Sequence, residues 1–211
     1  MSVWDERAAA YRASEEHREG WDLELLVRWA AGARTALDVA SGGGHVARRL
    51  REEGLEVVAC DSAPGMRPDV VCRAEDLPFA DSSFDVVACR LAAHHFADVR
   101  QGMAEMARVA RERVLVVDNL SMSEAGEEAN RLRDPSHVRN YTEEEWRSLL
   151  AAAGLEVAEV ETRERAIGLG PWLERTGCAG EDAERVRELL ADRIDGDRYT
   201  LDRVALKARR R

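Results

Sequence analysis

The sequence lacks the features that would place it in a membrane or around a metal centre. No apolar run approaches the roughly 20 residues that a membrane-spanning helix needs. The N-terminal segment mixes acidic and basic residues before any apolar stretch, unlike a signal peptide. The four cysteines form no CxxC pair and follow no metal-ligand spacing. We therefore expect a cytoplasmic protein without integral membrane contact, with reduced structural cysteines and no metal site.

Positive charge is also scarce in comparison with negative charge. The chain has 31 lysine and arginine residues against 41 aspartate and glutamate residues, a net charge of −10, and Lys207 is the single lysine. A nucleic-acid-binding protein needs a basic face. The basic run Arg209–Arg211 is more typical of a solvated C-terminal tail. The charge balance therefore predicts no nucleic-acid partner.

Strand-like and helix-like segments alternate along most of the chain. A length of 211 residues with 45% apolar residues suffices for one globular domain. The alternation is typical of an α/β fold, in which helices cover both faces of a mostly parallel sheet. The expected strands are 35–40, 56–60, 69–72, 84–90 and 114–117, followed by an antiparallel edge hairpin of 155–162 and 198–206. The sequence thus predicts a seven-stranded sheet in a single domain spanning residues 1–211.

The sharpest local signal is the string LDVASGGGHVA at residues 37–47, between the first strand and the helix that follows. Its glycines permit a tight turn and close approach of a ligand to the backbone at the carboxyl end of a parallel strand. Asp61, nineteen residues after Gly42, follows the second strand, where it can accept hydrogen bonds from two ribose hydroxyls. These features predict an adenosine-containing cofactor. Gly42-x-Gly44-x-x-Ala47 also satisfies the dinucleotide fingerprint, so this motif leaves two cofactor classes open.

Three further features favour a cationic nucleoside over a dinucleotide. Asp38, four residues before Gly42, would repel a pyrophosphate and attract a positive group. In AEDLPF, residues 74–79, Asp76 can accept from the adenine amine, and Leu77 and Phe79 offer apolar surface to the base. The strand FDVVACR then returns the chain to the same edge of the sheet after a short turn.

Several longer strings carry a family resemblance over nearly the whole chain. They are Tyr11-x-x-Ser14-x-x-His17-x-x-Gly20-x-Asp22-Leu23, LDVASGGGHVA, AEDLPFADSSFDVV, CRLAAHHFADV, VVDN and RLRDPSHVRNYTEEEW. In these strings the sequence resembles the class I S-adenosylmethionine-dependent methyltransferases. The closest resemblance is to the methyltransferase type 11 family, which is related to the ubiquinone and menaquinone-biosynthesis methyltransferases. It implies a Rossmann-like fold and the cofactor S-adenosyl-L-methionine, with S-adenosyl-L-homocysteine as product.

The resemblance also implies which residues bind the cofactor. The methionine part would be held by Asp38, Ala40, Ser41, Gly42 and Gly44. Asp61 would hold the ribose hydroxyls, with Ser62 and Met66 beside the adenine, and Glu75, Asp76 and Leu77 would contact the adenine edge. The backbone near Arg90 and Leu91 would bind the ammonium group. Tyr11 and His17 would belong to an N-terminal lid formed by residues 1–33. Residues 120–141 would form a cap over the acceptor pocket.

The sequence departs from the family pattern at two positions that concern the site. Ala40 stands where the family usually has the first glycine of the motif, a change that is tolerable if this residue keeps an ordinary φ. Between the second and third strands only Ser62–Pro68 remain, where the family has a helix of about four turns. Parallel neighbours usually need a longer crossover. We expect this shortened connection to be extended and to leave the adenine pocket more open.

Methyl transfer from a sulfonium is an in-line displacement, which needs a base only if the acceptor loses a proton. The candidate bases are His95, His94 and His137, with a structural role in the loop as the alternative reading of each. Arg133 and Arg139 either clamp a carboxylate or phosphate of the acceptor or pair with acidic neighbours.

The function predicted from sequence is methyl transfer to a small molecule. The family resemblance favours a carbon or oxygen atom of a quinone-like or aromatic acceptor, and an apolar loop at Ile167–Leu173 is a candidate lining of its pocket. Two alternatives stay open: a non-catalytic regulator that binds S-adenosylmethionine, and a nicotinamide-dependent oxidoreductase. A monomer and a homodimer are both compatible with the sequence.

Overall fold

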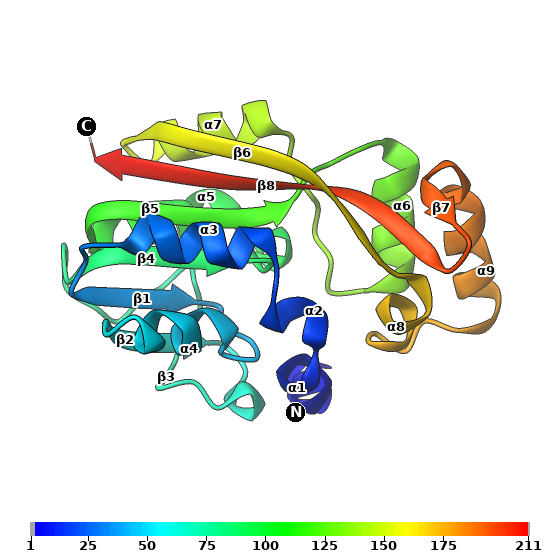
Figure 1. Ribbon diagram of the computed structural model, residues 1–211, viewed down its shortest axis with the longest axis horizontal. Coiled ribbons are helices and arrows are strands. Elements are labelled where there is room, and N and C mark those ends of the chain that lie inside the picture. Colours follow the sequence, from blue (N-terminus) through cyan, green and yellow to red (C-terminus); the bar gives the residue numbers. More distant parts are fainter. Residues whose placement is uncertain (1–2, 211) are drawn as a thin grey trace.

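A twisted eight-stranded sheet forms the centre of the computed structural model, which describes residues 3–210 (Figure 1). Seven strands follow the order β3-β2-β1-β4-β5-β8-β6, and β7 pairs with β8 beside this path. The strands are β1 (Thr35–Val39), β2 (Glu56–Asp61), β3 (Val70–Val71), β4 (Phe84–Arg90), β5 (Ala110–Asn119), β6 (Leu155–Gly168), β7 (Ile194–Asp195) and β8 (Arg198–Arg210). The first five are parallel, whereas β8 is antiparallel to both β5 and β6. The predicted seven-stranded, mostly parallel sheet with an antiparallel edge hairpin is confirmed. Residues 1–2 and 211 of the predicted domain lie outside the described part.

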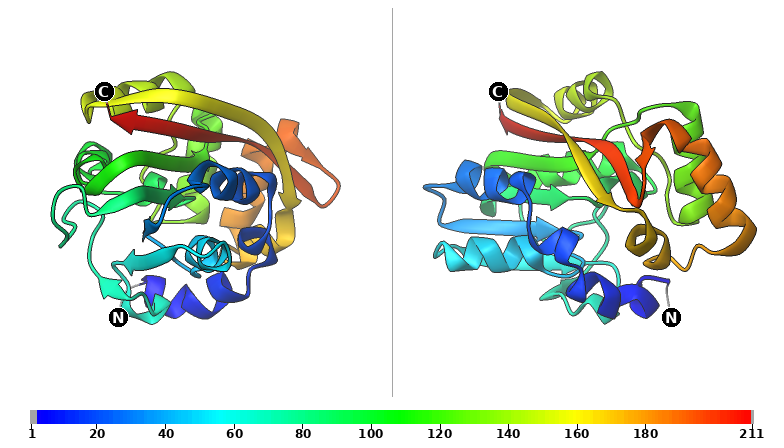
Figure 2. Two further views of the ribbon diagram at one scale, coloured as in Figure 1. Left: turned by 60° about the vertical axis from the view of Figure 1, so that its left-hand side comes forward. Right: turned by 45° about the vertical axis from the view of Figure 1, so that its right-hand side comes forward.

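The helices cover both faces of the sheet (Figures 1 and 2). They are α1 (Val3–Ala13), α2 (Glu15–Arg18), α3 (Trp21–Ala30), α4 (His45–Glu52), α5 (Val99–Val109), α6 (Glu124–Arg133), α7 (Glu143–Ala152), α8 (Leu169–Glu174) and α9 (Gly180–Leu189), with short 3-10 turns η1 (Pro64–Met66), η2 (Ala93–His95) and η3 (Ala191–Arg193). On one face Met103 of α5 and Trp146 of α7 are fully buried, and on the other Leu26 of α3 and Leu50 of α4. Every residue of β4 is buried, as its continuous apolar sequence requires of a central strand.

The edge hairpin of β6 and β8 is longer than the sequence indicated. Both strands run past the main sheet, and their far ends pack with α6, α8 and α9 into a second hydrophobic cluster (Figure 1). Ile167 and Trp172 are buried in this cluster, so the segment expected as a pocket-lining loop is instead core. At the other end the backbone of Arg209 in β8 is the register partner of Arg113 in β5. Arg209 therefore lies in the last strand of the sheet, with its side chain exposed, and not in a tail beyond it. Arg211 lies outside the described residues.

The connection between β2 and β3 contains the single turn η1 and no α-helix, as predicted. The side of this turn that faces the carboxyl ends of the strands is covered by α1. The backbone N–H of Gly65 donates to Asp5 Oδ1 over 2.7 Å, and Arg12 Nη1 donates to the Gly65 carbonyl over 2.7 Å. Ala8 and Met66 are buried against each other. The N-terminal helix thus packs over the turn that stands in place of the missing helix, and a more open adenine pocket stays a prediction.

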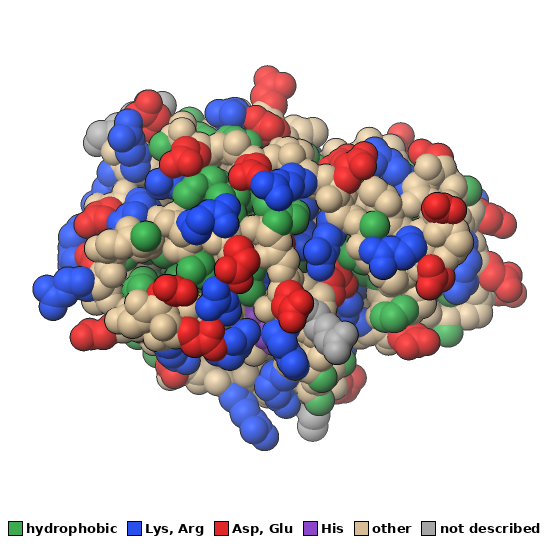
Figure 3. Space-filling model, viewed as in Figure 1, with side chains coloured by type: hydrophobic (Ala, Val, Ile, Leu, Met, Phe, Trp, Pro, Cys, Tyr) green, Lys and Arg blue, Asp and Glu red, His purple; other side chains and the backbone are tan. Residues whose placement is uncertain are grey.

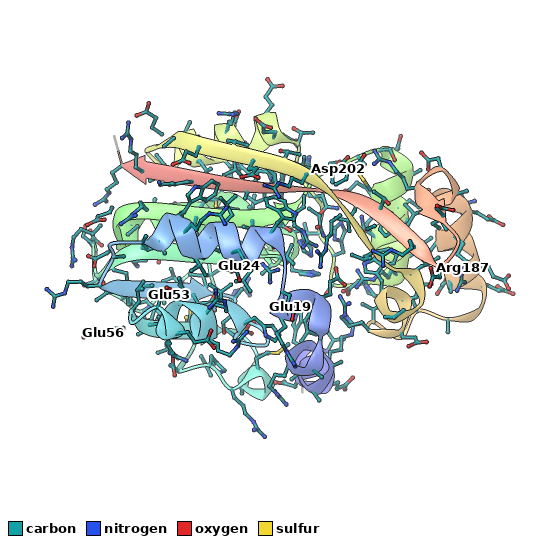
Figure 4. The ribbon with its side chains drawn as sticks, in the orientation of Figure 1. Glu19, Glu24, Glu53, Glu56, Arg187 and Asp202 are labelled. Carbon is teal, nitrogen blue, oxygen red and sulfur yellow. The ribbon has the colours of Figure 1, made fainter. Side chains whose placement is uncertain are left out.

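Ion pairs of the surface join neighbouring elements at several places. Glu24 projects from α3 toward α4 (Figure 4) and accepts from Arg49 Nη2 over 3.0 Å. Asp202 of β8, also labelled there, lies 3.4 Å from Arg193 Nη2. None of the helices within residues 3–210 combines the length and the apolarity that crossing a membrane demands.

Candidate active site

A cavity of about 270 Å³ lies at the carboxyl ends of β1, β2 and β4. Parallel strands bring their carboxyl ends to one edge, which is where ligands bind in open α/β sheets. Most of the residues expected at the cofactor line it. These are Tyr11, His17, Asp38, Ala40, Ser41, Gly42, Asp61, Ser62, Met66, Glu75, Arg90 and Leu91. The sequence pattern and the cavity therefore select largely the same residues, although their contacts with a cofactor stay a prediction.

The turn between β1 and α4 has left-handed backbone at three positions. Gly42 has φ +50° and Gly44 has φ +74°, conformations that favour glycine. The Gly44 N–H donates to the Ser41 carbonyl over 2.8 Å, which closes the turn. Ala40 has φ +54°, so the condition of an ordinary φ, under which alanine would replace the glycine without strain, is not met. A left-handed alanine costs about 1 kcal/mol, and the bond from the Ser41 N–H to the Cys60 carbonyl, 3.0 Å long, holds the adjacent backbone in place.

Two carboxylates flank this turn and are both held by backbone amides. Asp38 Oδ2 accepts from the Ala47 N–H over 2.9 Å, while Asp61 accepts from Gly42 and from Ala63 over 2.8 and 2.9 Å. Burial and, to a smaller extent, the nearby charge of Asp61 raise the pKa of Asp38 to about 7. Burial also raises the pKa of Asp61. The two acids thus lie where their negative charge is disfavoured until a positive group or a hydrogen-bond donor arrives.

Arg90 connects the end of β4 to the N-terminal helices. Its Nε donates to Asp22 Oδ2 over 2.6 Å, and its Nη1 donates to the His17 carbonyl over 2.8 Å. Its Nη2 is buried and has no hydrogen-bond partner among the described residues. Gly20 permits this arrangement, because a Cβ at that position would lie 2.5 Å from Asp22 Oδ1. The ion pair therefore fixes the segment that carries His17 against the strand end.

The cavity wall differs from the expected residue set at three positions. Gly44 caps α4 and does not line the cavity. Asp76 is exposed and bridges to Arg73, and Leu77 is buried in the sheet core, where its N–H donates to Glu105. The chain after β3 turns its AEDLPF segment toward α5, so the structure does not bring Asp76 and Leu77 to the predicted adenine edge.

One of the three candidate bases reaches the cavity. His95 lines it, whereas His94 and His137 lie behind His95, with ring centroids 4.1 and 6.2 Å from its ring. His94 Nδ1 lies 2.5 Å from Asp118 Oδ1, and His137 Nε2 lies 3.1 Å from Glu127 Oε2. Asp118 and Glu127 thus form hydrogen bonds with His94 and His137, the two candidate histidines that do not line the cavity.

The hydrogen bonding of His95 defines its tautomer. Its Nδ1 lies 3.0 Å from the backbone oxygen of Ser136, and a carbonyl oxygen only accepts. Nδ1 therefore carries the proton, which leaves Nε2 with a free lone pair. Burial, with a smaller contribution from His94, holds the pKa of His95 well below its ordinary value of 6.5. The neutral imidazole at the cavity wall is a suitable proton acceptor near pH 7.

Several lining residues were not singled out by the sequence. They are Trp4, Gly43, His45, Val46, Cys72, Arg73, Ala74, Ala92, Phe96 and Ala97. The Trp4 ring packs edge-on against Tyr11 and His95, with centroids 5.9 and 4.7 Å apart. The seven-residue spacing of Trp4 and Tyr11 on one helical face was a usable signal. His45, the first residue of α4, also donates from Nε2 to the Tyr11 carbonyl over 3.1 Å.

The two arginines considered for the acceptor have different surroundings. Arg139 is exposed and pairs with Glu145 over 2.6 Å, as the structural alternative predicted. Arg133 instead packs on the Trp172 ring, 4.3 Å from its centroid. In the part of the chain that the structure describes, no group of three or more histidine, cysteine, aspartate and glutamate residues has an arrangement that would hold a metal ion.

Comparison with known proteins agrees with this geometry. Residues 37–117 match the family model described as a methyltransferase domain. An uncharacterized methyltransferase, YcgJ of Bacillus subtilis, is 32% identical over 89% of this chain and 82% of its own length. Its crystal structure has a TM-score of 0.80 at 26% identity, covering 90% of this chain and 98% of that one. A demethylmenaquinone methyltransferase of Beutenbergia cavernae is 39% identical over 39% of this chain and 40% of its own length.

Proposed function

The chain belongs to the class I S-adenosylmethionine-dependent methyltransferases, and from this premise we propose that it binds S-adenosylmethionine in the cavity and methylates a small molecule. The observation that carries the proposal is the pair Asp38 and Asp61 at the cavity wall, which accept from the backbone amides of Ala47 in α4 and of Gly42 in the glycine turn. A pyrophosphate beside these acids would be repelled, whereas a sulfonium and an ammonium group would be attracted. The premise and this pair together disfavour the nicotinamide alternative.

The residues at the wall suit each part of this cofactor. Asp61 has carboxylate lone pairs left over after its two backbone bonds, and these would accept from ribose hydroxyls. Arg90 offers a buried Nη2 without a partner among the described residues, a donor that the carboxylate of the methionine part would satisfy. Met66 and Phe96 supply buried apolar surface for a base. This donor set therefore fits the group.

The chain's own residues contribute alignment, water exclusion and a proton acceptor. When bound, the cofactor supplies a methyl group on a sulfonium, which a nucleophile displaces in line. Trp4 and Tyr11 of α1 cover one side of the cavity and exclude water from it. His95 Nε2 would take a proton from an acceptor hydroxyl or acidic carbon, while the Ser136 carbonyl holds the ring by Nδ1.

The acceptor belongs to the same proposal. We place it at the side of the cavity where the Trp4 ring contacts both His95 and Tyr11, and residues 120–141 would cap it, since Ser136 of this segment touches His95. The kinship with a demethylmenaquinone methyltransferase supports a carbon or oxygen atom of an aromatic or quinone-like ring. The cytoplasmic location, the lack of a nucleic-acid partner and the monomer or homodimer state stay predictions from sequence.

Isothermal titration calorimetry tests the cofactor assignment. We expect S-adenosylhomocysteine to bind one site per chain and NADH to release no heat. Asp61→Asn should weaken the binding about tenfold or more, because a carboxylate accepts the ribose hydroxyls better than an amide does. Binding of NADH with no binding of S-adenosylhomocysteine would overturn the proposal.

Catalysis is tested separately from binding. A screen of phenols, quinols and aromatic acids with methyl-labelled S-adenosylmethionine should yield a labelled product that depends on the protein. Tight cofactor binding without transfer to any acceptor class would support the non-catalytic regulator in place of the enzyme.

A further inference from the structure

Among the side chains that the structure describes, guanidinium groups outnumber carboxylates where the N-terminal helices meet the far end of the β6–β8 hairpin. Charged side chains of both signs gather over this boundary (Figure 3). The ion pairs here are Arg7–Asp134 at 2.9 Å, Arg90–Asp22 at 2.6 Å, Arg175–Glu16 at 2.7 Å, Arg203–Asp22 at 3.4 Å and Arg203–Glu16 at 3.7 Å. The carboxylates of Glu16 and Asp22 are thus each shared by two arginines. In a chain with a net charge of −10, this local excess of positive charge calls for an explanation.

Arg133 is left without an anionic partner in this network. No carboxylate of the described residues lies within 4.0 Å of it, although it is the last residue of α6 and Asp134 follows directly. The Asp134 carboxylate is occupied by Arg7 and by the backbone and hydroxyl of Ser136. Arg133 Nε donates to the Trp172 carbonyl over 3.1 Å, but its two terminal nitrogens donate to none of the residues described.

The Arg133 side chain is half-buried and packs against aromatic rings. Its guanidinium lies 4.3 Å from the Trp172 ring centroid, and the Trp172 and Tyr199 rings are 4.8 Å apart. Burial lowers the pKa of Arg133, while Tyr11, Asp134 and Glu16 counter this in part. A guanidinium in such a place retains its charge at a free-energy cost, which an anion with two oxygens in the plane of its terminal nitrogens removes.

This unpaired group lies close to the transfer site. Tyr11, whose side chain lines the cofactor cavity, has Arg133, Arg175 and Arg7 as its nearby cations. The Arg175 guanidinium is 6.0 Å from the Tyr11 ring centroid. Tyr11 thus belongs to the cavity wall and also lies beside one guanidinium of this network, that of Arg175.

We infer that the methyl acceptor is an anion whose carboxylate or phosphate binds the terminal nitrogens of Arg133, with its apolar body against Tyr11, which lines the cavity. The identification of this anion as the acceptor rests on the proposed function, whereas the anion site itself does not. Lysine would not serve as well, because the planar guanidinium matches two oxygens at once.

Calorimetry on the full chain saturated with S-adenosylhomocysteine tests the inference. Phenyl phosphate and benzoate are titrated as anionic probes, and benzyl alcohol as the neutral counterpart. We expect at least one anion to bind at least about tenfold more tightly than the alcohol. The ratio of the two anion affinities tells a phosphate-bearing acceptor from a carboxylate-bearing one.

Arg133→Gln should lower the anion affinity about tenfold or more, and Arg133→Lys should recover part of it. The matched control is Arg131→Gln. Arg131 is an exposed arginine two residues earlier on the same helix, and its substitution should leave the anion affinity unchanged. Equal anion affinity in the Arg133→Gln and Arg131→Gln variants overturns the inference. An Arg133→Gln variant that loses thermal stability but keeps the anion affinity of the unaltered protein also overturns it.

The two proposals fail in different ways. If S-adenosylhomocysteine does not bind but the anions still bind through Arg133, the proposed function fails and the anion site stands. If the cofactor product binds and the anions do not bind better than the alcohol, the inference fails and the proposed function stands.

Discussion

At the scale of single residues, the site depends on buried charges whose protonation is set by their surroundings. Asp38 illustrates this, because its carboxyl is buried on β1 and has a single backbone donor, Ala47. Its pKa of about 7 lies above the ordinary 3.8, so between these values the folded chain holds a proton that the unfolded chain has released. The free energy of unfolding therefore falls as the pH rises from about 4 to about 7, by the contribution of this group.

The variant Asp38→Asn should abolish that part of the pH dependence, because an amide does not titrate. Urea denaturation between pH 5 and pH 8 measures it. A cationic ligand prefers the ionised carboxylate, so the affinity for S-adenosylmethionine should rise from pH 6 to pH 8 in the unaltered protein and stay flat in the variant. S-adenosylhomocysteine, which lacks the sulfonium, is the matched ligand and should respond less. A pH profile shared by both proteins would contradict the role of Asp38.

His95 provides a prediction that needs no acceptor. Its ring should remain neutral with the proton on Nδ1 at pH 6, because Ser136 accepts that proton and burial lowers the pKa. Long-range 1H–15N NMR distinguishes the tautomers, and the His95→Gln variant identifies the signal. With an acceptor in hand, the same variant should lose about 100-fold or more in rate while S-adenosylhomocysteine binding is retained. An Nε2–H tautomer, or unchanged turnover, would remove His95 as the base.

At the scale of elements, the N-terminal helix is the part whose position matters most for the cavity. α1 packs on η1, and a Cβ at Gly65 would lie 2.8 Å from the Asp5 Cα. The backbone of Gly65 fixes the position of this Cβ, and the Asp5 Cα belongs to the backbone of α1. Rotation of a side chain therefore cannot relieve this overlap. The seating of α1, and with it Trp4 and Tyr11, is therefore sensitive to one methyl group on η1.

We expect Gly65→Ala to displace α1 and to weaken S-adenosylhomocysteine binding about tenfold, with little loss of global stability. Calorimetry measures the affinity, and hydrogen exchange of residues 3–13 measures the docking. Gly170→Ala is the matched control, since nothing lies within 4 Å of a Cβ at that position. Full affinity in Gly65→Ala, with α1 still protected, would show that the helix does not act as a lid.

At the scale of the whole molecule, two hydrophobic clusters are joined mainly by the long hairpin. The central cluster packs both faces of β4, whereas the second cluster lies beyond the main sheet (Figure 1). In α9 only Ala183 and Val186 are buried, so few apolar contacts hold it. Local opening with low free energy is expected where buried contacts are few.

Hydrogen exchange detected by mass spectrometry should therefore show α9 exchanging at least about tenfold faster than β4. Saturation with S-adenosylhomocysteine should slow the exchange of α1 and leave α9 nearly unchanged, because α9 does not line the cavity. Exchange of α9 and β4 at one common rate would instead mean that the two clusters open as a single unit.

The sequence by itself determined the parts that depend on neighbours along the chain. The apolar run of Phe84–Arg90 predicted a strand buried on both faces with the bounds observed, and the glycines at 42–44 predicted a tight turn at the end of β1. The alternation of strands and helices predicted a mostly parallel sheet covered by helices on both faces. These patterns are local, so the steric preferences and the burial of neighbouring residues are sufficient to predict them.

Only the tertiary structure decided which distant residues meet. That α1 packs over the short β2–β3 connection follows from contacts of Asp5 with Gly65, which no spacing announces. That His95 rather than His94 reaches the cavity depends on Asp118, which engages the other ring from β5. The left-handed Ala40 and the unpaired Arg133 likewise depend on the packing around them. These features result from many weak contacts between segments that are far apart in the sequence. The pattern of any single segment therefore does not predict them.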